Sequence, residues 1–326
     1  TKHVKVSHKD TNLKRKIEEP KEKIKDPEDL IDAEGFICLP ASEEVPEEVE
    51  NELQAFRANR VTFNTELSEK LKDTSSLDPK IKDVYSKVGK ILRGYRSGKL
   101  PNAFKIIPGL EKWMEILELT SPDDWSPQAV YQATKIFVSS MGPKQSQKFL
   151  YRTLYNAAKK DIQKHKKLNY HHYLALKKAF YKPAAWIRGI LFPLCEEDCT
   201  LKEATIIGSV ISKVSIPMLH AGAALIKLSD MECTGPVIHF IKVLLQKRYA
   251  LPGRVLASVC KFFYKLIMDD RRMPVMWHQA LLTLAQYYGK EIEPELKDEI
   301  RELIKIHNHP QITPEIRKFL FNEGRE

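Results

Sequence analysis

From residue 79 onward, apolar residues recur every three or four positions, which is the spacing of one face of an α-helix. The first run consists of Ile81, Val84, Tyr85, Val88, Ile91, Leu92 and Tyr95. Asp78 suits the N-cap, Pro79 the first helical position, and Gly98 the C-terminal stop. The pattern therefore predicts a helix that begins at Pro79 and ends before Gly98.

Proline then marks the start of one apolar-periodic run after another. The steps are Ser126-Pro127, Gly142-Pro143, Lys182-Pro183, Ile216-Pro217, Gly235-Pro236, Leu251-Pro252, Met273-Pro274, Glu293-Pro294 and Thr313-Pro314. Thr200 and Glu203 have the spacing of a capping box. No segment alternates apolar and polar residues with the period of a strand. The sequence therefore predicts an all-α protein.

The arrangement of these helices is either a bundle or an array of stacked helical hairpins. About 40 residues separate successive helix pairs, which favours an array of the HEAT or armadillo type. No residue pattern recurs from pair to pair, so we expect an irregular helical-hairpin solenoid. It would occupy residues 79–326 as one all-helical domain.

Residues 1–78 have a different composition. Residues 14–32 are mostly charged and contain Pro20 and Pro27, and residues 42–52 are acidic. Such segments bury little apolar surface, so we expect a largely disordered extension. The short apolar run at residues 36–39 is a candidate docking segment within it.

Composition excludes several classes of protein. No apolar stretch approaches the ~18–20 residues that cross a bilayer, so we expect no membrane partner. Five cysteines in 326 residues are too few for a disulfide scaffold and indicate a reducing compartment.

The net charge of +10 is concentrated in one segment. Residues 144–188 contain twelve Lys or Arg and a single acid, Asp161, so the rest of the chain is close to neutral. If residues 144–166 form one helix, then Lys144, Lys148, Arg152, Lys159 and Lys166 fall within about 80° of one another at 100° per residue. Like charges at this spacing repel, and a row of phosphates would relieve that repulsion.

The segment is therefore a candidate RNA-binding surface. Its candidate residues are Lys144, Lys148, Arg152, Lys159, Lys160, Lys164, Lys166, Lys167, Lys177, Lys178, Lys182 and Arg188. The aromatic residues between them are Tyr151, Tyr155, Tyr170, Tyr173, Phe180, Tyr181 and Trp186, and each is either a core residue or a platform for an unpaired base. An acidic peptide is the alternative partner for the same face, in which case the protein is a solenoid adaptor.

No motif indicates catalysis. The string GYRSGK at residues 94–99 has the wrong glycine spacing for a phosphate-binding loop and closes a helix instead of opening one. Cys195 and Cys199, with His220 or Cys233, lack the second tight ligand pair of a structural zinc site, so we expect buried free thiols. The sequence predicts no enzyme activity, no metal, no cofactor and no small-molecule substrate.

Several long strings resemble the bystin family. They are YRSGKLPNAFKIIP (95–108), NYHHYLALKKAFYKPAAWIRGILFPLCE (169–196), EATIIGSVISKVSIPMLHAGAALIK (203–227), RYALPGRVL (248–256), PVMWHQALLTL (274–284) and HPQITPEIRKFL (309–320). They occur in the same order as in that family, over roughly residues 79–321.

The resemblance implies a eukaryotic ribosome-assembly factor without catalytic residues. It implies pre-rRNA processing and maturation of the small (40S) subunit, with snoRNA binding. The implied partners are pre-rRNA, ribosomal proteins and assembly factors of the small-subunit head. The implied location is the nucleus and nucleolus, with passage to the cytoplasm on precursor particles. The family is also linked to a cell-adhesion complex, which is the adaptor alternative.

Overall fold

A computed structural model describes residues 79–197, 199–269 and 271–321. Within these ranges the chain forms helices and turns and contains no strand, which confirms the predicted all-α array. The predicted extension, residues 1–78, lies outside the described residues. None of the described helices combines the length and the apolar composition needed to cross a bilayer.

The first half of the described chain combines long helices with short ones. The N-terminal ones are α2 (Pro79–Gly94), α3 (Asn102–Ile106), α4 (Trp113–Leu119) and α5 (Pro127–Ser140), with the 3-10 turns η1 (Ile107–Gly109) and η2 (Pro122–Asp124). The central ones are α6 (Pro143–Phe149), η3 (Leu150–Tyr155), α7 (Asn156–His165), α8 (Tyr170–Ala179), α9 (Pro183–Trp186), η4 (Ile187–Leu191) and α10 (Phe192–Glu196).

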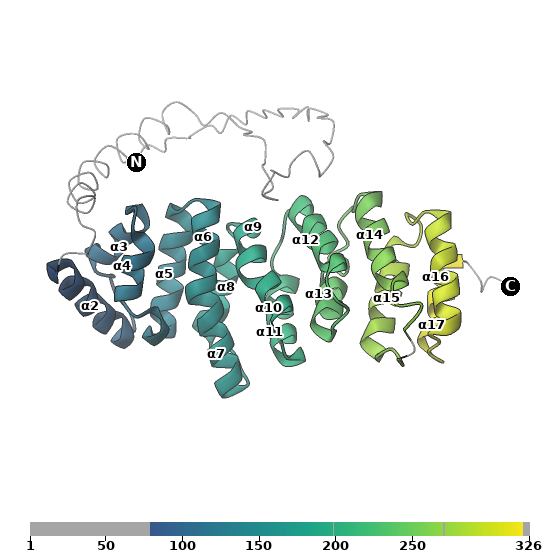
Figure 1. Cartoon of the computed structure of the whole chain (residues 1–326), viewed down its shortest axis with the longest axis horizontal. Helices are drawn as coiled ribbons and strands as arrows, with labels where there is room; N and C mark the ends of the chain where they lie inside the picture. Colours follow the sequence, from purple (N-terminus) through teal and green to yellow (C-terminus); the bar gives the residue numbers. More distant parts are fainter. Residues whose placement is uncertain (1–78, 198, 270, 322–326) are drawn as a thin grey trace, which may run out of the picture. The chain divides into compact units, whose positions relative to one another are not determined.

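The second half of the described chain is a regular array of hairpins. Its helices are α11 (Leu201–Lys213), α12 (Met218–Asp230), α13 (Gly235–Leu245), α14 (Gly253–Tyr264), α15 (Val275–Tyr288), α16 (Pro294–Ile306) and α17 (Ile312–Phe321). Helices α11, α13, α15 and α17 pack one on the next in one row, and α12, α14 and α16 do so in a second row (Figure 1). This two-row packing is the expected geometry of a helical-hairpin solenoid.

Most helices begin within one residue of the predicted prolines and caps, and α17 begins at Ile312, two residues before Pro314. Pro127, Pro143, Pro183 and Pro294 are first residues of helices, and the Ser126 hydroxyl accepts a hydrogen bond from the amide of Ala129 at 3.2 Å. One end differs from the prediction, because the first helix ends at Gly94 and Gly98 takes a positive φ in the turn that follows.

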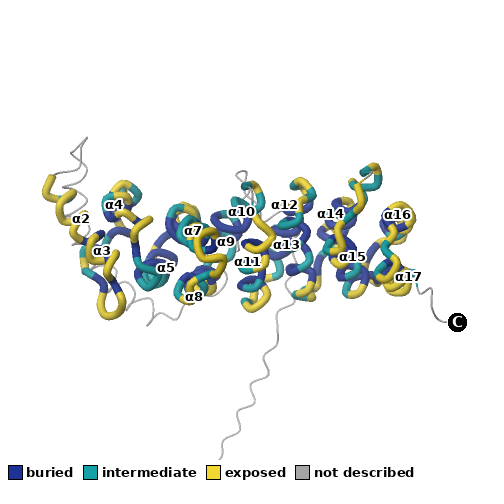
Figure 2. The backbone as a smooth tube through the Cα atoms, turned by 90° about the horizontal axis from the view of Figure 1, so that it is seen from below, coloured by how far each residue is buried: buried dark blue, intermediate teal, exposed yellow. Residues whose placement is uncertain are grey.

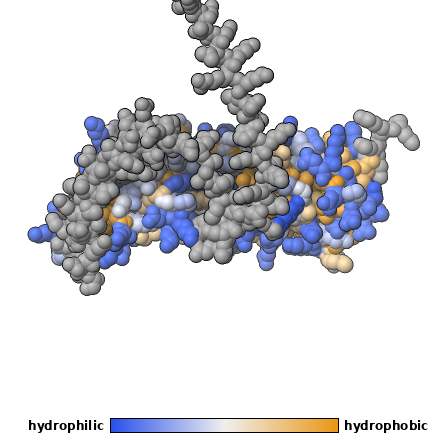
Figure 3. Space-filling model, turned by 90° about the horizontal axis from the view of Figure 1, so that it is seen from above, coloured by the Kyte–Doolittle hydropathy of each residue, from blue (hydrophilic) through white to orange (hydrophobic). Residues whose placement is uncertain are grey.

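The core is continuous through the described helices. Its largest fully buried side chains include Trp186, Trp277, Phe104 and Phe137. Buried positions lie along the inner sides of the helices, and exposed positions lie mainly on the turns and outer sides (Figure 2). On the face drawn in Figure 3, hydrophobic residues are visible between hydrophilic ones, so polar side chains do not cover this face completely.

Candidate nucleic-acid interface

The basic segment begins with one helix that changes type in the middle. The helix runs without a break through α6, η3 and α7, and η3 is π-helical. A π turn uses one residue more than an α turn, so the residues after it are rotated back by about 100°. Ala158 and Ile162, both 3% exposed, face the core only with this rotation.

The rotation changes which cations share the solvent face. Lys144, Lys148 and Arg152 keep their places at about 0°, 40° and 80° around the helix axis. After the π segment, Lys160 and Lys164 join them at about 60° and 100°, whereas Lys159 and Lys166 rotate away. We call Lys144, Lys148, Arg152, Lys160 and Lys164 the ridge. A row of cations is therefore present, but the predicted membership of Lys159 and Lys166 in it was wrong.

Within the ridge, Arg152 is paired with carboxylates of the protein itself. Its guanidinium donates to Glu118 at 2.5 and 2.7 Å and to Asp123 at 2.9 and 2.8 Å. The hydrogen bonds that Arg152 donates to Asp123, and then those to Glu118, raise the pKa of Arg152. The bond to Asp123 also lowers the pKa of that carboxylate. Lys160 also lowers the pKa of Asp123 through its charge.

Lys159 lies on a different side, in a cluster around Glu197. The Glu197 carboxylate accepts hydrogen bonds from Lys159, from Tyr155 at 2.7 Å and from Tyr151 at 3.4 Å. Burial alone would raise the pKa of Glu197, but the bonds from Lys159 and Tyr155 lower it. The rings of Tyr151 and Tyr155 stack at 5.3 Å. These three side chains, from η3 and α7, hold the C-terminal end of α10 through Glu197.

Two further predicted cations are half-buried. The Lys182 ammonium donates to the carbonyl of Met141, at the C-terminal end of α5, and to the Ser146 hydroxyl at 3.5 Å. Burial lowers the pKa of Lys182, and a cation at a helix C-terminus also interacts favourably with the helix dipole. Arg188 is half-buried in η4.

Asp161, the single acid of the segment, organises the turn between α7 and α8. It accepts from the amide of Asn169 at 2.6 Å and pairs with the imidazoles of His165 at 2.9 Å and His172 at 3.2 Å. Burial alone would raise the pKa of Asp161, but these hydrogen bonds lower it. The turn so held presents Lys166, which has a φ of 56°, and Lys167 to solvent.

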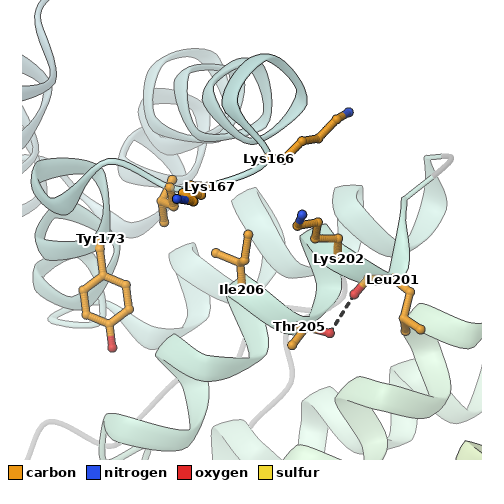
Figure 4. Close-up of a pocket in the computed structure, with 8 residues that line it drawn as sticks. Lys166, Lys167, Tyr173, Leu201, Lys202, Thr205 and Ile206 are labelled. Atoms are coloured by element: carbon orange, nitrogen blue, oxygen red, sulfur yellow. Dashed lines mark hydrogen bonds between the residues drawn. The ribbon is translucent and has the colours of Figure 1, made fainter.

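Beside this turn lies an open groove of ≈ 680 Å³ (Figure 4). Its lining includes Lys166 and Lys167 from the turn and Lys202 from α11. Lys213, also on α11, lies 5.7 Å from the centre of the Tyr173 ring, which lines the same groove. Sequence reasoning missed Lys202 and Lys213, because α11 meets α8 only in the folded chain.

Lys177 and Lys178 are exposed in the last turn of α8. Lys178 shares a smaller groove of ≈ 250 Å³ with Lys135 of α5 and Tyr181. Lys135, which the sequence analysis also missed, lies 5.1 Å from the centre of the Tyr131 ring. Since α5 packs along α8, this groove follows from tertiary structure.

The aromatic residues of the segment divide into core and surface. Phe180 and Trp186 are buried and stack on each other at 4.1 Å, and Tyr155 is buried as well. Tyr170 and Tyr181 are 67% and 68% exposed, so their rings are open to solvent. Tyr151 is 43% exposed, but its ring stacks on Tyr155, so Tyr170 and Tyr181 are the main candidates for stacking on an unpaired base.

The cysteines of the described chain are free thiols, but only Cys260 is fully buried. Burial raises the pKa of Cys199 and of Cys260 to about 12 and that of Cys233 to about 11. Burial also raises the pKa of Cys195. Across residues 79–321, apart from the two undescribed positions, no group of three or more His, Cys, Asp or Glu is placed to hold a metal ion.

Comparisons with known proteins point to one family. The family model described as Bystin matches residues 41–326. A protein of Schizosaccharomyces pombe named only as uncharacterized is 50% identical over 248 residues, covering 76% of this chain and 55% of its own length. Bystin of Bos taurus is 48% identical over 245 residues, 75% of this chain and 56% of its own. Bystin of Homo sapiens is 47% identical with the same coverage. The match thus spans a little over half the length of these relatives.

Proposed function

The chain belongs to the bystin family, and from this membership we propose that it is a non-enzymatic factor of ribosome biogenesis. It binds pre-rRNA, together with ribosomal proteins and assembly factors, in precursors of the small subunit and acts in pre-rRNA processing. It works in the nucleus and nucleolus and accompanies its particles to the cytoplasm. Burial raises the pKa of the Cys199 and Cys260 thiols, which disfavours either as a catalytic nucleophile because a protonated thiol reacts poorly.

The ridge is the observation that supports RNA as the partner. Its lysines Lys144, Lys148, Lys160 and Lys164 are exposed on one face of a helix and extend over about 30 Å at 1.5 Å per residue. A row of like charges on a rigid helix destabilises the helix slightly and matches the phosphates of a nucleic-acid backbone. Because such contacts carry no base preference, the ridge positions the protein on RNA and does not read its sequence.

The proposal is tested by reversing charges on the ridge without touching the fold. The variant Lys148→Glu/Lys160→Glu/Lys164→Glu leaves Arg152 and its two carboxylates intact. We expect it to lose RNA crosslinks in cells and to sediment free of small-subunit precursors, while its melting temperature stays within a few degrees of the wild type.

A matched control is Lys227→Glu/Lys261→Glu/Lys290→Glu, which reverses three exposed lysines on other parts of the array. This variant should keep its rRNA crosslinks and its place in the gradient. If both variants remain on precursor particles at physiological salt, the ridge is not the RNA contact. If the wild type crosslinks to no RNA, the adaptor function takes the place of the one proposed.

A further inference from the structure

The groove between the α7–α8 turn and α11 differs from the ridge because apolar side chains form its floor. Its lining is mostly apolar and includes Leu168, Ile206 and Leu201, which is 47% exposed. Ile206 lies between Tyr173 and Lys202 in the close-up (Figure 4). Its volume of ≈ 680 Å³ falls within the range of about 300–1,000 Å³ typical of binding pockets. Apolar surface open to solvent in a concave site is the mark of a binding surface.

The margin of the groove is cationic. Lys166 and Lys167 approach from the turn and Lys202 from the first turn of α11, and all three are exposed. Lys213 adds a fourth ammonium, which lies over the Tyr173 ring at 5.7 Å from its centre. Among the described residues that line the groove there is no carboxylate. An occupant therefore needs negative charge at its edges and apolar side chains at its centre.

Both ends of the groove are fixed by local hydrogen bonds. Asp161 holds the turn that carries Lys166 and Lys167. On the other side, Thr200 and Glu203 form a capping box in which the Thr200 amide donates to Glu203 at 2.8 Å and the Glu203 amide donates to Thr200 at 3.3 Å. The groove is therefore preformed, so an occupant loses little free energy in organising it.

These features favour a peptide over RNA. Phosphates would interact with the lysines but would gain nothing from Leu168 and Ile206. An RNA base could not stack on Tyr173 either, because this residue is half-buried and the Lys213 ammonium lies over its ring. We propose that this groove binds an acidic segment of a partner protein, with leucine or isoleucine side chains on the floor and carboxylates at Lys166, Lys167 and Lys202. The site is separate from the ridge and does not depend on RNA binding.

The proposal is tested with the full chain and a labelled probe by fluorescence anisotropy. The probe is a 16-residue peptide that repeats Glu-Leu-Glu-Glu, and it is compared with one peptide that has Gln in place of every Glu and one that has Ser in place of every Leu. We expect the first peptide to bind and both altered peptides to bind at least about fivefold more weakly, as expected for the loss of about 1 kcal/mol.

Variants locate the site. Lys166→Glu/Lys202→Glu should weaken the probe at least about fivefold, and Leu201→Ser should weaken it without changing the charge. The control for this double variant is Lys227→Glu/Lys261→Glu, which reverses two of the same control lysines. This control and the ridge variant Lys148→Glu/Lys160→Glu/Lys164→Glu should both bind the probe with an affinity within about twofold of the wild type. Such a result separates the groove from the RNA contact.

Three results would overturn the assignment. One is equal affinity of the probe for the groove variants and the wild type. Another is unchanged binding of the peptide that lacks leucine, since charge alone would then explain it. The third is a groove variant that loses affinity for a hairpin RNA while the wild type binds no peptide, because the groove would then belong to the RNA surface.

Discussion

Arg152 connects the helix of the ridge to α4 and η2 through four hydrogen bonds to two carboxylates. Bidentate pairs of this kind are stronger and more specific in geometry than single contacts. The Arg152 side chain is 26% exposed and the side chains of its two partners are more exposed still. Solvent screening therefore limits the contribution of these ion pairs to about 1–2 kcal/mol.

We therefore predict that Arg152→Ala lowers the free energy of unfolding by about 1–2 kcal/mol at pH 7. The folded pKa of Asp123 is depressed, so its contribution is present above its unfolded pKa and is lost as the pH falls through the folded value. Measured by urea denaturation, the difference in the free energy of unfolding between Arg152→Ala and the wild type should therefore be smaller at pH 3 than at pH 7.

The control for this prediction is Arg96→Ala, an exposed arginine in the turn after α2. Arg96→Ala should lower the free energy of unfolding by less than about 0.5 kcal/mol at both pH values. If Arg152→Ala loses the same free energy of unfolding at pH 3 and at pH 7, the pairing of Arg152 with the two carboxylates does not account for its contribution to stability.

Among the helices, those that begin at a proline or a cap could be placed from the sequence. The Thr200–Glu203 capping box and Ser126 act within three residues, so their effect is visible in local spacing. The π-helical segment η3 could not be found this way. It packs against η4, which is also π-helical. Its one trace in the sequence is that Ala158 and Ile162, which are buried, fall away from the core face when 100° per residue is assumed throughout. The wrong placement of Lys159 and Lys166 follows directly from it.

The close approach of η4 to α6 requires a glycine at position 189. A Cβ atom built on Gly189 of η4 would lie 2.8 Å from the carbonyl oxygen of Gln147 on α6. Gly189→Ala must therefore push α6 away from η4. We predict a loss of about 1–3 kcal/mol in the free energy of unfolding, the usual cost of overpacking.

Gly253→Ala is the matched substitution, because a Cβ atom at this first position of α14 meets nothing within 4 Å. Thermal denaturation should show it to be as stable as the wild type or slightly more stable. Equal melting temperatures for the two variants would contradict the close approach of α6 and η4.

At the scale of the molecule, the sequence located the cationic surface but not its division. The excess charge of residues 144–188 is visible in composition, because charge is a property of the residues themselves. The structure divides it into an exposed ridge, a groove and cations bound to the protein's own carboxylates and carbonyls. Lys135, Lys202 and Lys213 join these surfaces only because α5 and α11 pack beside α8.

The most direct test of the RNA contact is the salt dependence of binding to a labelled hairpin RNA. Each phosphate neutralised contributes about −0.7 to −0.9 to the slope of log K against log salt concentration. The variant Lys148→Glu/Lys160→Glu/Lys164→Glu removes three such contacts, so its slope should be shallower than that of the wild type by about 2 to 3. The control Lys227→Glu/Lys261→Glu/Lys290→Glu should keep the wild-type slope. Identical slopes for the ridge variant and the wild type would contradict the account.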